Sequence, residues 1–136
     1  MSEQERAVRA FVEAFNEQQL ERLASLLDPA AEIQTRRGVA IGREEAKAWA
    51  RSNPDGALVQ RLELDTVSER GNHVLVDLRR QWHWREPPDG GENGKPADES
   101  PLSLVATFRD GLICRWQPFE DRDRALALLA ATTAAR

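Results

Sequence analysis

The hydrophobic residues of this chain change their spacing along its length. Up to residue 56 most of them recur three or four residues apart, which is the period of an amphipathic helix. Over residues 57–119 they alternate with polar residues or form branched and aromatic runs, which is typical of strands. The remaining residues return to a helical pattern. This order predicts an α+β fold, and no repeat or linker interrupts it, so we expect one domain over residues 1–136.

The helical half is expected to contain three helical elements and a short strand. The first region runs from about Glu5 to Leu27, is broken near Asn16, and ends at Asp28-Pro29 because the residue before proline disfavours helix. Alternation predicts a short strand over Ala31–Arg36. A third helix is expected over Gly42–Ser52, since acidic residues occupy its first turn.

The pattern of the second half predicts a four-stranded antiparallel meander followed by a final helix. The expected strands cover residues 57–67, 73–85, 102–109 and 112–119, and Asp110-Gly111 predicts a tight hairpin between the last two. The polar segment 86–101 is rich in glycine and proline and is predicted to be a mobile loop. The final helix is expected to turn Leu126 and Leu129 inward.

Alternation along the strand 73–85 divides its large side chains between two faces. The more apolar set, which should face the helices, includes Arg80, Trp82 and Trp84. His83 falls on the opposite face with Gln81. A catalytic histidine in an aromatic pocket is therefore disfavoured.

The two-residue turn also predicts the register of the last hairpin. It sets Ala106 opposite Arg115 and Leu104 opposite Gln117 on the inner face. Apolar residues then remain on the outer face, and a sheet that is apolar on both sides predicts a homodimer through that face. The candidate interface residues are Val105, Cys114 and Trp116.

Composition excludes several classes of function. The net charge is −4, which argues against a nucleic-acid surface, and no apolar run is long enough to span a membrane. The first residues are polar and acidic, unlike a secretory signal. Cys114 is the only cysteine, so we expect a cytoplasmic protein without an internal disulfide.

Four stretches together resemble the nuclear transport factor 2-like superfamily, and its SnoaL-like branch in particular. They are AVRAFVEAFNEQQLERLASLLDPAAEI (7–33), GREEAKAW (42–49), FRDGLICRW (108–116) and PFEDRDRALALL (118–129). The resemblance covers nearly the whole chain. It implies a curved antiparallel sheet wrapped around helices into a cone, a hydrophobic pocket at the open end, and often a dimer.

The reactions found on this fold are poorly matched by the residues present. The isomerase-like and dehydratase-like sites use a tyrosine, which this sequence lacks, and the cyclase-like sites use a His or Asp shortly after the residue equivalent to Ile113. Asp121 comes later and is expected to cap the last helix rather than to catalyse. An epoxide-hydrolase-like site needs an arginine between two carboxylates, and we judge that set incomplete, since Asp77 points away from Arg80. Glu63 and Asp65 are expected to face solvent.

No metal or cofactor is predicted. His73 and His83 lie ten residues apart on one expected strand, roughly 33 Å at strand rise, so they cannot share an ion. Cys114 has no second cysteine beside it.

The leading hypothesis is therefore a pocket for a small, partly apolar molecule. Its candidate lining residues are Trp49, Arg80, Trp82, Trp84, Arg115 and Gln117. The tryptophans could instead fill the core, and the arginines could pair with Glu13 or Glu45. A lyase, isomerase or hydrolase with an unusual site and a dimeric protein-interaction module stay open. A cavity with an arginine beside an acid would favour the enzyme, one without acids would favour binding, and a cone filled by tryptophans would favour interaction.

Overall fold

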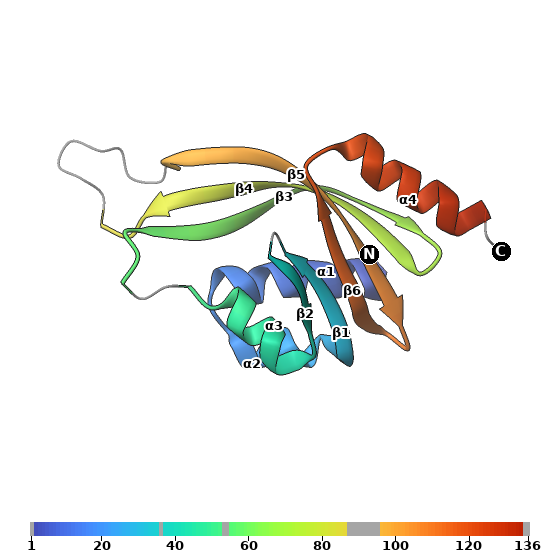
Figure 1. Ribbon diagram of the computed structural model, residues 1–136, viewed down its shortest axis with the longest axis horizontal. Coiled ribbons are helices and arrows are strands. Elements are labelled where there is room, and N and C mark those ends of the chain that lie inside the picture. The colour runs from blue at the N-terminus through green and yellow to red at the C-terminus, as the bar shows by residue number, and fades with distance from the viewer. Residues whose placement is uncertain (1, 36, 53–54, 87–95, 135–136) are drawn as a thin grey trace.

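The computed structural model describes residues 2–35, 37–52, 55–86 and 96–134 (Figure 1). Its helices are α1 (Glu3–Asn16), α2 (Leu20–Ser25), α3 (Arg43–Ala50) and α4 (Arg122–Ala134). Its strands are β1 (Leu27–Thr35), β2 (Gly38–Ile41), β3 (Leu58–Arg70), β4 (His73–Trp84), β5 (Asp98–Arg109) and β6 (Leu112–Phe119). They form one sheet in the order β2-β1-β6-β5-β4-β3, in which only β1 and β6 run parallel. The predicted α+β class is confirmed.

Helices cover the two faces of the sheet unequally. Figure 1 shows α1, α2 and α3 on one side, which we call the inner face, and α4 on the other, the outer face. The main core lies between the inner face and α1–α3, with Val76 and Leu104 of the sheet among its buried residues. A smaller cluster on the outer face joins Leu75 and Val105 to Ala125 and Leu129 of α4.

Three expectations need correction. β5 begins at Asp98, inside the segment predicted as the loop 86–101, because it pairs along β4 as far as Trp82; residues 87–95 of that loop lie outside the described residues. β1 begins at Leu27, and the short edge strand β2 was not predicted at all. Leu126 is partly exposed instead of inward, since Ala125 takes the position one turn before Leu129.

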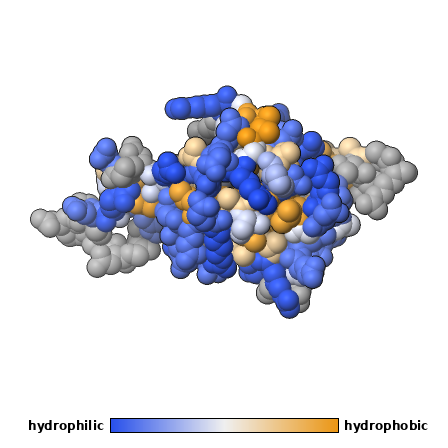
Figure 2. Space-filling model, turned by 90° about the horizontal axis from the view of Figure 1, so that it is seen from below, coloured by the Kyte–Doolittle hydropathy of each residue, from blue (hydrophilic) through white to orange (hydrophobic). Residues whose placement is uncertain are grey.

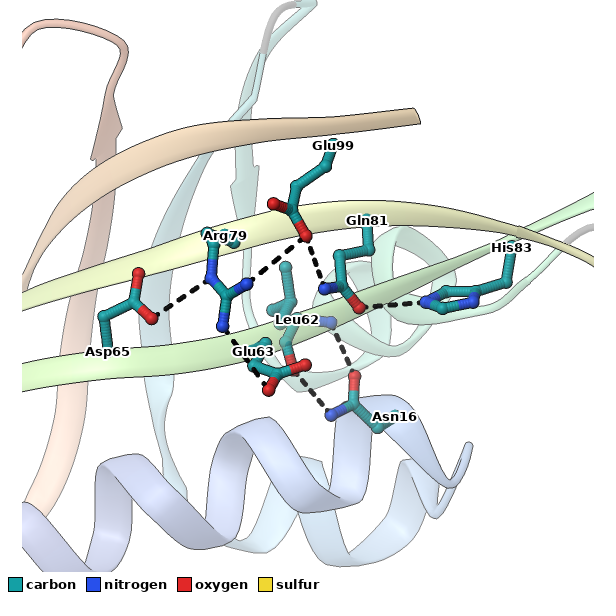
Figure 3. Close-up of polar contacts among 8 residues, drawn as sticks. All are labelled: Asn16, Leu62, Glu63, Asp65, Arg79, Gln81, His83 and Glu99. Carbon is teal, nitrogen blue, oxygen red and sulfur yellow. Dashed lines mark hydrogen bonds and ion pairs between the residues drawn. The ribbon is translucent and has the colours of Figure 1, made fainter. Parts of the chain in front are cut away.

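The side chain of Asn16 joins the end of α1 to the edge strand β3. Its amide nitrogen donates to the carbonyl oxygen of Leu62, and its amide oxygen accepts from the Leu62 N–H, both at 2.8 Å (Figure 3). Because β3 lies at the end of the sheet, Asn16 takes the place of a neighbouring strand at this point. Asn16 therefore fixes the distance between α1 and the part of β3 that faces Arg80.

Asp77 anchors the start of α4 to the outer face. Its carboxylate accepts hydrogen bonds from Ser103 (2.7 Å) and Thr66 (2.9 Å) and forms an ion pair with Arg122 (3.1 Å), the first residue of α4. Asp121 caps the same helix as predicted, since its carboxylate accepts from the backbone N–H of Asp123 at 2.9 Å.

Replacing Asp77 with asparagine removes the charge that these donors share. Burial raises the pKa of the Asp77 carboxyl, but the hydrogen bonds from Ser103, Thr66 and Arg122 outweigh it and hold the pKa below its ordinary value. Such a carboxylate stabilises the fold above its unfolded pKa of about 3.9, and the contribution is lost as the pH falls through the folded value. We expect D77N to lower the free energy of unfolding by about 1–3 kcal/mol near neutral pH. In urea titrations the difference should shrink as the pH falls below the unfolded pKa of about 3.9 and through the lower folded value.

Asp110→Asn is the matched control for this measurement. Asp110 lies in the hairpin turn at φ 53°, a conformation that asparagine also adopts readily. D110N should leave the stability nearly unchanged at both pH values. A D77N defect of the same size at both pH values would contradict the assigned role of the Asp77 charge.

Candidate ligand-binding site

Aromatic rings fill the space between the helices and the sheet. The Phe11 ring lies 4.2 Å from the Trp116 ring and 6.3 Å from the Trp49 ring, measured between centroids, and Phe15 lies 5.5 Å from Trp49. Trp116 and Phe11 are essentially fully buried. Side chains therefore fill this part of the cone, and any space for a ligand lies nearer the strand ends.

The predicted register of the last hairpin was wrong beyond its first pair. Phe108 does pair with Ile113 after the Asp110-Gly111 turn, but Cys114 is an extra residue on β6, so Thr107 pairs with Arg115 and Ala106 with Trp116. A bulge of this kind exchanges the two faces of the strand beyond it. The bulge turns Trp116 into the core.

Arg115 and Gln117 consequently point to the outer face, away from the pocket for which they were candidates. Arg115 is about half exposed and forms an ion pair with Glu32 of β1 at 3.2 Å. Gln117 pairs in register with Val105, which lies beneath α4. Neither residue belongs to a site on the inner face.

Arg80 and Trp82 lie on the inner face of β4, as predicted. Arg80 pairs with Leu62 on one side and Ser100 on the other. Trp82 pairs with Gln60 and with Asp98. We call the inner face around Arg80 and Trp82, where β3, β4 and β5 extend beyond the helices in Figure 1, the mouth.

Two open hollows meet at Arg80. One, of about 520 Å³, is bordered by Leu102, Pro118 and Phe119 and by polar residues that include Gln34 and Arg124. The other, of about 670 Å³, is bordered by Trp82, Asp98, Ser100 and Pro101. Arg80 and Glu120 line both hollows. A molecule in the mouth would therefore touch Arg80 from either side.

The Arg80 side chain has a buried polar atom without a partner. Among the described residues, its Nε forms no hydrogen bond although it is shielded from solvent. Leaving such a donor unpaired costs about 1–3 kcal/mol. The pairings with Glu13 and Glu45 considered from the sequence do not occur, since Glu13 contacts Arg22 and Glu45 accepts from the Ile41 N–H.

The remaining tryptophan candidates lie apart from Arg80. Trp84 is 46% exposed at the end of β4, beside Leu58 of β3. Trp49 packs against Phe11 and Phe15 and also borders a separate shallow hollow of about 610 Å³ beside β2. The structure therefore places Trp82 beside Arg80 but does not bring Trp49 into the same hollows.

Polar side chains on the outer face of the same strands form a network of their own (Figure 3). Arg79 contacts the carboxylates of Glu63, Asp65 and Glu99 at 3.1–3.5 Å. The network continues from Glu99 through Gln81 (2.6 Å) to His83, whose Nε2 lies 2.9 Å from the Gln81 amide oxygen. Glu63 and Asp65 are exposed on this face, so the prediction that they face solvent is confirmed.

Sequence reasoning missed two acidic residues of the mouth. Asp98 was included in the expected loop, yet it pairs with Trp82 and faces the same side as Arg80. Glu120 follows β6 directly and borders both hollows. The alternation of Asp98 and Ser100 before Leu102 was the available signal, but the prolines and glycines around it concealed the strand.

The residues expected at a dimer interface are differently placed. Val105 is covered by α4 and Trp116 lies in the core, while Cys114 is partly buried at the bulge. The apolar outer face from which a dimer was inferred is thus partly covered by α4 of the same chain.

Figure 2 shows the side that carries α1–α3 as mostly hydrophilic, with apolar atoms in small separate areas. The homodimer stays a prediction.

Two further observations limit the chemistry. Within the described ranges, no three or more His, Cys, Asp or Glu side chains are grouped so that they could hold a metal ion. No helix of the described residues is long and apolar enough to cross a bilayer.

Residues 8–116 match the SnoaL-like domain, so the chain belongs to that family. Solved structures confirm the nuclear transport factor 2-like fold. An NTF2-like protein of unknown function from Burkholderia pseudomallei is 22% identical at a TM-score of 0.70, and the match covers 95% of this chain and 98% of that one.

Two other similar structures show how varied proteins of this fold are. An M. tuberculosis LEH-like epoxide hydrolase is 16% identical at a TM-score of 0.69, covering 98% of this chain and 93% of that one. A hypothetical protein with a ketosteroid isomerase-like fold from Catenulispora acidiphila, solved in complex with trimethylamine, is 18% identical at 0.67 and covers 83% of each chain. No curated protein matches this chain significantly.

The bulge at Cys114 predicts opposite consequences for two neighbouring substitutions. Trp116→Ala removes a core ring that contacts Phe11 and should lower the free energy of unfolding by about 3–5 kcal/mol. Gln117→Ala changes an outer-face side chain and should cost less than about 0.5 kcal/mol. Thermal and urea unfolding of both variants would measure this. Equal, small effects would contradict the bulged register.

Proposed function

We propose that this protein binds a small, partly apolar molecule in the mouth, with a carboxylate or carbonyl oxygen of the ligand at Arg80. The observation that carries this proposal is the Arg80 Nε, which is buried and unpaired where two hollows meet. A small rotation of the Arg80 side chain would bring Nε to the edge of a hollow, where a ligand oxygen would supply the missing acceptor. A guanidinium group also offers a planar pair of donors that matches a carboxylate.

Apolar side chains beside Arg80 support the proposal that the ligand is partly apolar. Leu102, Pro118 and Phe119 border one hollow and Trp82 borders the other. A few polar groups among apolar walls is the usual composition of a small-molecule site. Burying a ligand's apolar part there would contribute about 25 cal/mol per Å² removed from water.

Arg80→Gln tests the proposal against a panel of aromatic and aliphatic carboxylic acids and their amides. We expect the wild type to bind at least one class, by isothermal titration and thermal shift, and R80Q to bind it about 10-fold or more weakly, because a charge-assisted hydrogen bond is lost. Arg61→Gln is the matched control, since Arg61 is an exposed arginine on the adjacent strand but on the outer face. R61Q should bind as the wild type does. Equal loss in both variants, or no binding by any compound, would refute the proposal.

A hydrolytic or lyase activity is the second candidate. It is favoured by Asp98 and Glu120, two acidic residues that border the same hollow as Arg80. An arginine can polarise a substrate oxygen while a carboxylate holds a water molecule or removes a proton. This set replaces the one considered from the sequence, in which the acids were Glu63, Asp65 and Asp77.

The same compounds, extended with epoxides and esters, distinguish catalysis from binding. Product detected by mass spectrometry with the wild type but not with Asp98→Asn or Glu120→Gln would establish an enzyme. Binding without turnover in all three proteins would leave the binding function alone.

A dimeric, cytoplasmic protein is part of this proposal. The lone Cys114 supports a reducing compartment. Apolar side chains that stay exposed, Trp84 and Leu58 among them, would be available to a second copy.

A further inference from the structure

Two opposite charges in the mouth lie close together without forming an ion pair. Asp98 pairs in register with Trp82, and Ser100 pairs with Arg80, so Asp98 and Arg80 are diagonal neighbours on the inner face, about 7–8 Å apart at their backbones. In the part of the chain that the structure describes, no hydrogen bond or ion pair joins them. Among the described residues, the Asp98 carboxylate accepts from the backbone N–H of the next residue, Glu99, at 2.9 Å and from no other group.

The adjacent arginine behaves differently. Arg79 is on the outer face of the same strand and contacts three carboxylates, those of Glu63, Asp65 and Glu99. Opposite charges on this sheet therefore do pair where the geometry brings them together. On the inner face, Arg80 and Asp98 instead border one hollow of about 670 Å³ and form no such pair.

The charges of this hollow do not suit a simple anion. Among the described residues that line it, Arg80 is the one cation, and the Asp98 carboxylate beside it has no ion-pair partner in the described part of the chain. A ligand with only a carboxylate would gain Arg80 but would also lie close to the Asp98 carboxylate, which repels it. A ligand with only an ammonium group would be repelled by Arg80.

This inference rests on the proposed function. We propose that the mouth binds a dipolar ligand. Its carboxylate lies on Arg80, and its ammonium group lies between the Asp98 carboxylate and the ring of Trp82. Trp82 is the register partner of Asp98, so a cation held by the carboxylate also lies near an aromatic ring. Both charges of such a ligand find their opposite in the protein, and its apolar body remains against Trp82.

Three compounds of nearly equal shape test this inference. 4-(Aminomethyl)benzoic acid is dipolar near neutral pH, 4-methylbenzoic acid is an anion and 4-methylbenzylamine is a cation. By isothermal titration we expect the dipolar compound to bind about 10-fold or more tightly than either of the others, since it forms both charge-assisted contacts.

Two substitutions locate the effect. Asp98→Asn should remove most of the advantage of the dipolar compound and leave 4-methylbenzoic acid bound as tightly as before or more tightly. Glu99→Gln is the matched control, because Glu99 is the next acid in the chain and faces outward to Arg79 and Gln81. E99Q should retain the advantage.

The outcomes separate this inference from the function on which it rests. If 4-methylbenzoic acid binds as tightly as the dipolar compound and R80Q weakens both, the Arg80 site is supported and the dipolar inference is overturned. If the advantage persists in D98N, the role of Asp98 is overturned. If none of the three compounds binds while other acids of the wider panel do, the inference fails and the proposed function survives; if nothing binds at all, both fail.

Discussion

The contact between Phe11 and Trp116 determines where this protein can hold a ligand. It joins α1 to the middle of the sheet and, with Trp49 and Phe15, fills the region where a cone of this fold could otherwise be hollow. Close packing leaves no room there without a large loss of stability. The open space is therefore confined to the mouth, where the strands extend past the helices.

That contact exists only because of the bulge at Cys114. Without the extra residue, Trp116 would lie on the outer face and Arg115 and Gln117 would point inward. The bulge therefore places the ring of Trp116 on the inner face in place of Arg115 and Gln117. It leaves Arg80 on the inner face, bordering both hollows, while α4 and Asp77 cover part of the outer face behind it.

Much of the architecture could be predicted because it depends on local patterns. Helical spacing located α1 and α3, alternation located β3 and β4, and Asp110-Gly111 formed the expected tight turn, with both residues at positive φ. The candidate site was predicted only in part. Arg80 and Trp82 share the inner face as expected, but Trp84 is exposed at the strand end and Trp49 borders a different hollow. Asp98 was missed because the glycines and prolines near it resemble a loop.

The sequence by itself determined the order of elements, the face of each β4 side chain and the lack of a tyrosine for the familiar reactions of this fold. Only the tertiary structure decided the register of β6, the covering of Val105 by α4 and the approach of Asp98 and Glu120 to Arg80. The physical reason is the distance along the chain between the residues that determine each feature. A strand's alternation follows from its own backbone, whereas a bulge or a charge beside a hollow depends on how residues far apart in the chain pack together.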